Sequence, residues 1–372
     1  MSKRLMITVL DSINQTTMPY NEFVLYRNKH YTDERQVLLL TGNEIVIPQK
    51  QIPENLEIHK VGKNPFCIRK KLKNIIREGQ KNHQELVVHL HSIRGSFSTL
   101  LAMMGLGLQA CTIYSIHSTF PGFRVHNKVF CLMDVLLSNH VTCVSNTSYS
   151  RFPASVKLLK GKKMQALQNG VNEERIDEGI ASLKKNKDIE RPLKFVYVAR
   201  LIPLKNHKFL VDVLANLPRE LKVKFVFVGM EDSTKTIRLY AEEKGIIDRI
   251  EFTGLIPREE VYPTLFNSDV YISSSTLEGL PVSVLEGMYC GLPAILSNIP
   301  QHKEVAKGCE SVSLLPYEVD AWVKKIIELS DLSDIERQNL GIISRNFVSK
   351  HFSLWRMHKE YDNIYNQIAK QL

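Results

Sequence analysis

The segment Asp269-Val-Tyr-Ile-Ser-Ser-Ser-Thr-Leu-Glu278-Gly-Leu-Pro-Val-Ser-Val-Leu-Glu286-Gly-Met-Tyr-Cys-Gly-Leu-Pro293 passes from a strand pattern into a helix pattern. Its residues 270–272 are β-prone, residues 278–281 have the composition of a turn, and helical spacing follows. The first N–H groups of a helix are unpaired and carry partial positive charge. The sequence therefore predicts that anionic or polar ligands bind where this strand ends.

Two interpretations of Glu278 and Glu286 stay open at this point. With Glu278 in the turn and Glu286 in the helix, the two carboxylates could contact opposite ends of an extended ligand. Alternatively, one glutamate simply favours the helix N-terminus and the other is solvated.

Strand-like and helix-like segments alternate along the chain in two series. The expected strands of the first series are 5–10, 36–40, 85–90, 112–116, 141–144 and 164–167, and those of the second are 194–198, 222–228, 250–252, 269–273, 294–296 and 311–314. Such alternation predicts parallel sheets covered on both faces by helices.

The two series predict an α/β protein of two doubly wound, Rossmann-like domains that face a cleft. The series break in the polar segment 182–192, so we place the N-terminal domain at 1–185 and the C-terminal domain at 186–351. An amphipathic helix at 352–372 is expected to pack back on the N-terminal domain. Ligands of such folds bind at the C-terminal ends of the strands.

Composition narrows the class of protein. The chain has 372 residues, of which 44% are hydrophobic, and no apolar run approaches the length of a membrane span. The N-terminal apolar run is too short for a signal sequence, which predicts a cytoplasmic protein. The six cysteines are scattered and lack the spacing of a metal site.

Positive charge is concentrated in the first half of the chain. Residues 1–188 hold 26 Lys and Arg against 15 Asp and Glu, whereas residues 189–372 hold 23 against 24. The segment 60–81 combines eight basic residues with apolar residues at helical spacing. It predicts either a helix that contacts an anionic membrane or an ordinary surface helix with its apolar stripe inward. Nucleic-acid binding is disfavoured because no recognition module is visible.

Two cations follow the first strand of the second series. In Val196-Tyr-Val-Ala-Arg200-Leu-Ile-Pro-Leu-Lys205-Asn206, a guanidinium and an ammonium flank a short loop, and Asn206 could cap the next helix. Such a pair suits a diphosphate, although solvated loop cations are the alternative.

Together, these segments resemble the large family of retaining glycosyltransferases with the GT-B fold (glycosyl transferases group 1), which includes sucrose synthases and bacterial polysaccharide mannosyl- and glucosyltransferases. The family pattern Ser-x-x-Glu-Gly-x-Pro-x-x-x-x-Glu-x-Met-x-x-Gly-x-Pro is matched at Ser275, Glu278, Gly279, Pro281, Glu286, Met288, Gly291 and Pro293. Further matches are 168–171, 227–229 and 252–254. The likeness is close over the second domain and weaker over the first.

The resemblance implies roles for the matching residues. Arg200 and Lys205 would neutralise the donor diphosphate, and Glu286 would bind the ribose hydroxyls. Glu278 and the amides after Gly279 would hold the hydroxyls of the transferred sugar, whereas Lys205 and the helix opening near Val282 would stabilise the leaving nucleoside diphosphate. The remaining donor-side residues implied are Thr253, Gly254, Gly279, Leu280, Pro281 and Val282.

Two histidines end strands of the first series. His117 matches a family histidine near the donor sugar, which implies a catalytic role beside Arg200, Lys205 and Glu278. His91 is expected to be structural, and His89 to lie in the core.

The chain departs from the family in two loops. The loop at 11–20 has no glycine pair, so a close backbone approach to phosphate is less favoured there. The Gly-Gly common before the last helix of the donor domain is also absent, and Asn298-Ile-Pro-Gln-His302 takes its place.

The function implied is transfer of a hexose from a nucleotide sugar, most plausibly a uridine diphosphate (UDP) sugar, to a saccharide or lipid-linked saccharide. Bacterial capsule or other surface polysaccharide synthesis is the expected setting, with peripheral contact at the inner face of the membrane. No metal or other cofactor is expected, because fixed cations can replace a divalent ion. The alternatives are a nucleotide-sugar epimerase or hydrolase of the same fold, or a non-catalytic subunit of a glycan-assembly complex.

Overall fold

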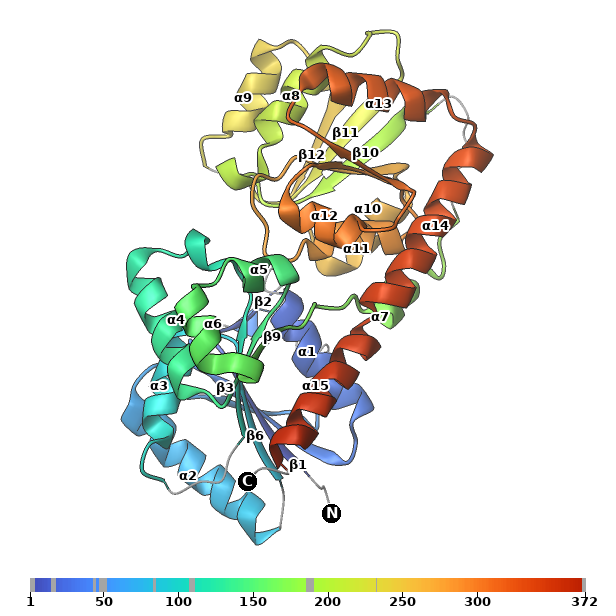
Figure 1. Ribbon diagram of the computed structural model, residues 1–372. Helices are drawn as coiled ribbons and strands as arrows, with labels where there is room; N and C mark the ends of the chain where they lie inside the picture. The colour runs from blue at the N-terminus through green and yellow to red at the C-terminus, as the bar shows by residue number, and fades with distance from the viewer. Residues whose placement is uncertain are drawn as a thin grey trace. The chain divides into compact units, whose positions relative to one another are not determined.

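The computed structural model describes residues 4–14, 18–42, 45–46, 52–82, 85–106, 111–184, 191–231 and 233–369. The chain forms two compact units (Figure 1): unit 1 is Met1–Gly170 with Trp355–Leu372, and unit 2 is Val171–Leu354. Residues 171–184, which we had placed in the N-terminal domain, therefore group with unit 2. Most of the expected linker 182–192 lies outside the described residues.

Unit 1 contains a seven-stranded parallel sheet in the order β5-β3-β1-β6-β7-β8-β9. Its strands are β1 (Arg4–Leu10), β3 (Glu34–Leu40), β5 (Glu57–Lys60), β6 (Glu85–Leu90), β7 (Cys111–Ile116), β8 (His140–Cys143) and β9 (Met164–Ala166), and β2 (Ile13–Asn14) pairs with β4 (Ile45–Val46) apart from it. The strand order reverses between the neighbours β1 and β6, so a ligand-binding crevice is expected at their C-terminal ends.

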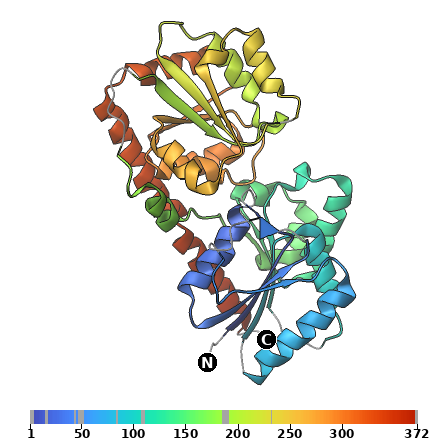
Figure 2. The same cartoon turned by 180° about the vertical axis from the view of Figure 1, so that it is seen from behind.

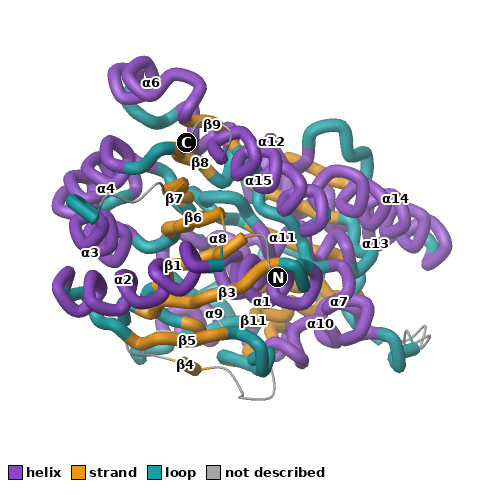
Figure 3. The backbone as a smooth tube through the Cα atoms, turned by 90° about the horizontal axis from the view of Figure 1, so that it is seen from below, coloured by secondary structure: helices purple, strands orange, loops and turns teal. Residues whose placement is uncertain are grey.

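Helices cover both faces of this sheet (Figures 1 and 3). They are α1 (Met18–His30), α2 (Pro65–Lys81), α3 (Ile93–Met103), α4 (Val125–Leu137), α5 (Asn146–Ser150), α6 (Ala154–Lys160) and α15 (Leu354–Ala369), with short 3₁₀ turns η2 (Phe120–Gly122) and η3 (Gly161–Lys163). The strands β1, β3 and β7 are buried almost throughout, as expected for a sheet covered on both sides.

The last helix, α15, packs on unit 1 beside α1 (Figure 2). The hydroxyl of Tyr365 lies 2.8 Å from Nδ1 of the fully buried His89, whose Nε2 lies 2.7 Å from Ser115 Oγ. Buried Arg27 on α1 bridges Glu34 and Asp362. The returning helix and the sheet are thus joined by hydrogen bonds between buried and partly buried polar side chains.

The basic segment 60–81 forms α2, which begins where Asn64 accepts a hydrogen bond from the Phe66 amide at 2.9 Å. Its apolar stripe of Ile68, Leu72, Ile75 and Ile76 is buried in the main hydrophobic cluster of unit 1. The ordinary surface-helix interpretation is therefore correct for the stripe, and the exposed side of α2 carries the basic residues together with Phe66, which is 82% exposed. None of the described helices is long and apolar enough to cross a bilayer.

Unit 2 contains a six-stranded parallel sheet in the order β12-β11-β10-β13-β14-β15. Its strands are β10 (Leu193–Val198), β11 (Val223–Val228), β12 (Ile250–Gly254), β13 (Val270–Ser273), β14 (Ala294–Ser297) and β15 (Val312–Leu315). Its helices are α7 (Glu173–Ile180), α8 (His207–Ala215), α9 (Thr236–Glu243), α10 (Arg258–Phe266), α11 (Val282–Tyr289), α12 (Pro300–Ala306), α13 (Val319–Asp331) and α14 (Asp334–Phe352), with 3₁₀ turns η4 (Pro203–Lys205) and η5 (Ile247–Arg249). Here the order reverses between β10 and β13.

Two glycines let the elements around this switch point approach closely. A Cβ on Gly229, after β11, would lie 2.0 Å from the carbonyl oxygen of Ala199, after β10. A Cβ on Gly287 would lie 2.2 Å from the Tyr271 ring. Gly287 therefore allows α11 to lie directly against β13, which positions its neighbour Glu286.

Candidate functional site

The serines that end β13 hold two loops of unit 2 together. Ser274 Oγ donates to the carbonyl oxygens of Lys205 at 3.1 Å and Asn206 at 2.9 Å. The Tyr197 hydroxyl lies 2.6 Å from Ser275 Oγ and donates to the Lys205 carbonyl at 3.1 Å. These side chains are buried, so their polar groups must bond internally. The cationic loop after β10 is thereby fixed against the carboxylate loop after β13.

Lys205 and Glu278 meet directly at this junction. Lys205 Nζ lies 2.5 Å from Glu278 Oε1, which also accepts a hydrogen bond from Ser275 Oγ at 2.6 Å. The two side chains keep 19% and 12% of their surface exposed. Glu278 Oε2 has no partner among the described residues, and the ammonium can donate further hydrogen bonds. The pair can therefore receive a ligand that has both an anionic and a hydroxyl group.

Arg200 begins the same loop and its side chain is exposed. Within the described residues, its guanidinium forms no ion pair. Asn206 stands at the N-cap position of α8, but its side chain makes no capping hydrogen bond. Its backbone is left-handed (φ 51°, ψ 41°), whereas a capping side chain requires an extended backbone.

Glu286 is buried in α11 and forms an ion pair with Arg258, the first residue of α10. Arg258 Nε also donates to the Tyr262 hydroxyl at 3.1 Å. A buried carboxylate without a cation would be costly, so the ion pair with Arg258 offsets the cost of burying Glu286. Sequence reasoning missed Arg258, because it lies 28 residues from its partner and belongs to no motif that we recognised.

Other predicted donor-side residues lie at the same edge of the sheet. Gly254 ends β12, and its carbonyl accepts hydrogen bonds from the Gly229 amide and from Thr253 Oγ1, both at 3.0 Å. The Val282 amide donates to the Leu280 carbonyl at 2.9 Å. That amide is therefore engaged within the turn.

His302, in the segment that replaces the Gly-Gly pair, is linked through Ser297 to the loop that carries Glu278. Its Nδ1 lies 2.9 Å from the Ser297 carbonyl, and Ser297 Oγ donates to the Ser275 carbonyl at 2.6 Å. Burial lowers the pKa of His302 to about 4. The imidazole is therefore neutral at pH 7 and has a structural role.

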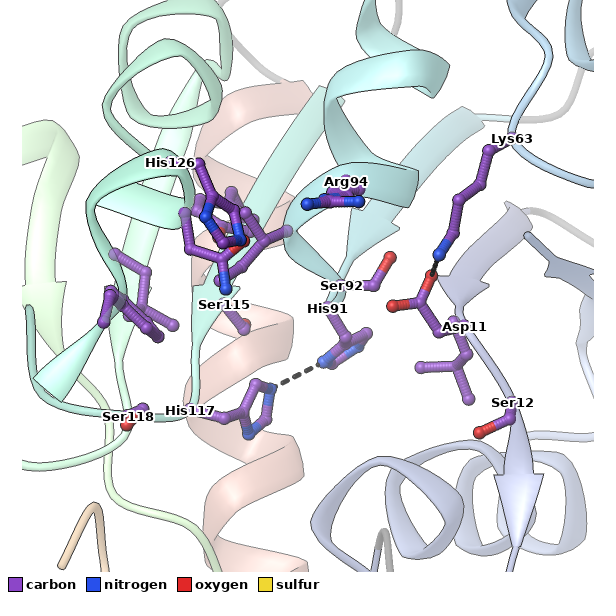
Figure 4. A pocket seen from close by; sticks show the side chains of 16 residues that line it. Asp11, Ser12, Lys63, His91, Ser92, Arg94, Ser115, His117, Ser118 and His126 are labelled. Atoms are coloured by element: carbon purple, nitrogen blue, oxygen red, sulfur yellow. Dashed lines mark hydrogen bonds and ion pairs between the residues drawn. The ribbon is translucent and has the colours of Figure 1, made fainter. Parts of the chain in front are cut away.

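Unit 1 has its own pocket, of about 500 Å³, at the ends of β1, β6 and β7 (Figure 4). His91 Nδ1 lies 3.0 Å from His117 Nε2 in its wall. Burial lowers the pKa of His91 to about 3, and burial likewise depresses the pKa of His117. Both rings are neutral at pH 7, so neither supplies a fixed positive charge. His91, expected to be only structural, lines the pocket as His117 does.

Charged side chains also line this pocket, together with apolar ones such as Leu10 and Phe123. Lys63 and Arg94 lie on its walls with His126, and Asp11 lies 3.9 Å from Lys63 Nζ. Across the described parts of both units, no group of three or more His, Cys, Asp or Glu side chains is arranged to hold a metal ion.

Comparison with known proteins relates this chain to glycosyltransferases. The family model of the glycosyl transferases group 1 matches residues 180–347. The capsular polysaccharide biosynthesis glycosyltransferase CapH from Staphylococcus aureus is 30% identical over 55% of this chain and 56% of its own length. The UDP-Gal:alpha-D-GlcNAc-diphosphoundecaprenol alpha-1,3-galactosyltransferase from Escherichia coli is 22% identical over 75% of this chain and 73% of its own.

Among solved structures, HepE from Anabaena in complex with UDP and glucose superposes with a TM-score of 0.75. The superposition covers 98% of this chain and all of HepE, at 15% sequence identity. At that identity the likeness establishes the fold, which is the GT-B fold expected from the resemblance.

Proposed function

Because this chain is a group 1 glycosyltransferase of the GT-B fold, we propose that it transfers a hexose from a UDP-sugar to a saccharide or lipid-linked saccharide, with retention of anomeric configuration. The observation that carries the proposal is the contact between Lys205 and Glu278 at the switch point of unit 2. The ammonium of Lys205 suits a phosphate and the carboxylate of Glu278 suits sugar hydroxyls. The loops that carry them are hydrogen-bonded to each other.

In the proposed donor complex, Arg200 binds diphosphate oxygens in a bidentate manner and Lys205 acts as a point charge. Glu278 accepts a sugar hydroxyl through Oε2, the oxygen that has no partner among the described residues. Glu286, held by Arg258, accepts the ribose hydroxyls. The backbone at residues 253–254 lies beside the base, and residues 279–282 form the wall next to the sugar.

The proposed chemical step breaks the bond between the anomeric carbon and the diphosphate, and the acceptor oxygen forms its new bond on the same face. The acceptor proton passes to the leaving phosphate. Arg200 and Lys205 stabilise the charge that develops on that phosphate, and on this account no divalent metal is required. In this proposal Glu278 orients the sugar through Oε2, while Lys205 and Ser275 hold its Oε1, and no covalent intermediate is part of the step.

The names of relatives support the choice of substrates. The E. coli relative uses UDP-galactose and an acceptor linked to diphosphoundecaprenol, HepE binds UDP and glucose, and CapH serves capsular polysaccharide biosynthesis. We place the acceptor in the pocket of unit 1, keep His117 as a donor contact, and assign the reaction to surface-polysaccharide synthesis at the cytoplasmic face of the membrane.

A panel of nucleotide sugars in a thermal-shift assay tests the donor proposal, because a ligand that binds only the folded state raises the melting temperature. A UDP-sugar should stabilise the wild type, and Lys205→Ala should remove most of that shift. No shift with any nucleotide sugar would contradict the proposal. Incubation of the donor without acceptor separates the epimerase alternative, since transferases release free sugar slowly whereas an epimerase rapidly interconverts the bound sugar.

A further inference from the structure

Helix α4 presents apolar side chains to solvent. Val125, Val129, Met133, Leu136 and Leu137 recur at helical spacing and are all exposed, Val125 by 78% and Val129 by 57%. The opposite side of the helix, which includes Cys131 and Val135, lies in the hydrophobic core. A helix that is apolar on its outer side as well as its inner side normally has a further partner.

Helix α6 also belongs to unit 1 and ends near the end of α4 (Figure 1). Its Leu158 and Leu159 are 85% and 71% exposed. Lys160, the last residue of α6, donates to the carbonyl oxygens of Leu136 and Ser138 at the end of α4. Lys160 therefore joins the end of α6 to the end of α4, and both helices expose leucine side chains in this part of unit 1.

Positive charge surrounds this face. Between Glu85 and Glu173 the sequence contains eight Lys and Arg residues and a single acid, Asp134. Asp134 is fully buried, and burial raises its pKa to about 9, so it is neutral at pH 7. Next to the exposed leucines, Arg151, Lys162 and Lys163 are exposed, and none of the three forms an ion pair with a described residue.

We propose that the outer face of α4 and α6 docks on an anionic lipid bilayer, with Leu158 and Leu159 inserted among the acyl chains and the neighbouring cations on the headgroups. Apolar burial combined with attraction to anionic lipid is the usual basis of interfacial membrane binding. A second copy of the chain fits less well, because a two-fold interface would place the same cations against each other.

This proposal refines the membrane contact in the proposed function by moving it from α2, whose apolar stripe is buried, to α4 and α6. It rests on the proposed function, because membrane binding would bring the enzyme to a lipid-linked acceptor. The surface contains none of the residues assigned to the donor, so the two proposals can fail separately.

Co-sedimentation of the full chain with vesicles tests the surface. Wild type should bind vesicles of phosphatidylcholine and phosphatidylglycerol and bind pure phosphatidylcholine weakly. Both Leu158→Ser with Leu159→Ser and Lys162→Ala with Lys163→Ala should lower the partition coefficient roughly tenfold or more. The matched control is Ile342→Ser with Ile343→Ser, an exposed apolar pair on α14 of unit 2, which should bind like wild type.

Three results would overturn the proposal: no binding of wild type to the anionic vesicles, unchanged binding of both patch variants, or loss of binding only when Lys70, Lys71 and Lys73 of α2 become alanine. Sedimentation equilibrium adds a fourth, a wild-type dimer that the leucine variant dissociates, which would assign the face to self-association. The UDP-sugar thermal shift of each variant should equal that of wild type, so failure of the donor proposal would be visible independently.

Discussion

Lys205 and Glu278 are 73 residues apart in the chain, yet Nζ of one lies 2.5 Å from Oε1 of the other. The contact forms because β10 and β13 are neighbours in the sheet, and the serines after β13 bond to the carbonyls of the Lys205 loop. The ammonium is therefore positioned before any donor binds. Such preorganisation is the main way in which fixed charges accelerate a reaction.

Replacing Lys205 with alanine should lower kcat/KM for transfer by a hundredfold or more, on the order of 3 kcal/mol of transition-state stabilisation. The control is Lys208→Ala, an exposed lysine on α8 in the same region. Circular dichroism should show both variants folded. A Lys205→Ala enzyme with wild-type kcat/KM would remove this residue from the site.

Replacing Arg258 with alanine should destabilise unit 2 by about 3–5 kcal/mol, because it leaves the carboxylate of Glu286 buried and unpaired. The double variant Arg258→Ala with Glu286→Gln should regain much of that stability, since the buried charge is gone. Denaturant unfolding measures both, and equal stability of single and double variants would show that the pair is not coupled. Donor affinity should stay low in both.

Folding stability should fall as the pH drops from about 6.5 to 4, because buried His302 must stay neutral. Its folded pKa of about 4 lies below the ordinary value of 6.5. Its contribution is therefore complete above pH 6.5, and up to roughly 3 kcal/mol is lost at the acid end. Urea unfolding at several pH values should give a shallower pH slope for His302→Gln than for wild type. Parallel slopes would contradict the assignment.

Transfer should continue in the presence of a chelator such as EDTA, because Arg200 and Lys205 are proposed to supply the positive charge that a divalent ion supplies elsewhere. The measurement is the initial rate with and without EDTA on metal-stripped enzyme. Loss of activity that Mg²⁺ or Mn²⁺ restores would show that the two cations are insufficient.

The fold follows closely from local pattern. Every strand expected in the two series is present within two residues of its predicted bounds, since strands buried on both faces form continuous apolar runs. The short edge strand β5 was missed because its four residues, Glu57–Lys60, are only partly buried and mostly polar. The sequence did not decide whether the apolar stripe of α2 faces the core or a membrane. Periodicity shows that a helix has an apolar side but not what that side contacts.

Predicting the site depended on a motif as well as on pattern. The resemblance marked the glutamates and the two cations, but not Arg258, since an ion pair across 28 residues has no local signature. The pairing of His91 with His117 was also missed, because it arises from the adjacency of β6 and β7. Alternation places both histidines at strand ends but does not reveal that their rings meet.

The most direct test of the central claim is a crystal structure of the complex with a UDP-sugar. The account predicts the diphosphate within hydrogen-bonding distance of Arg200 and Lys205, a sugar hydroxyl on Glu278 and the ribose hydroxyls on Glu286. A nucleotide bound elsewhere, or bound in unit 2 with its diphosphate away from both cations, would contradict it.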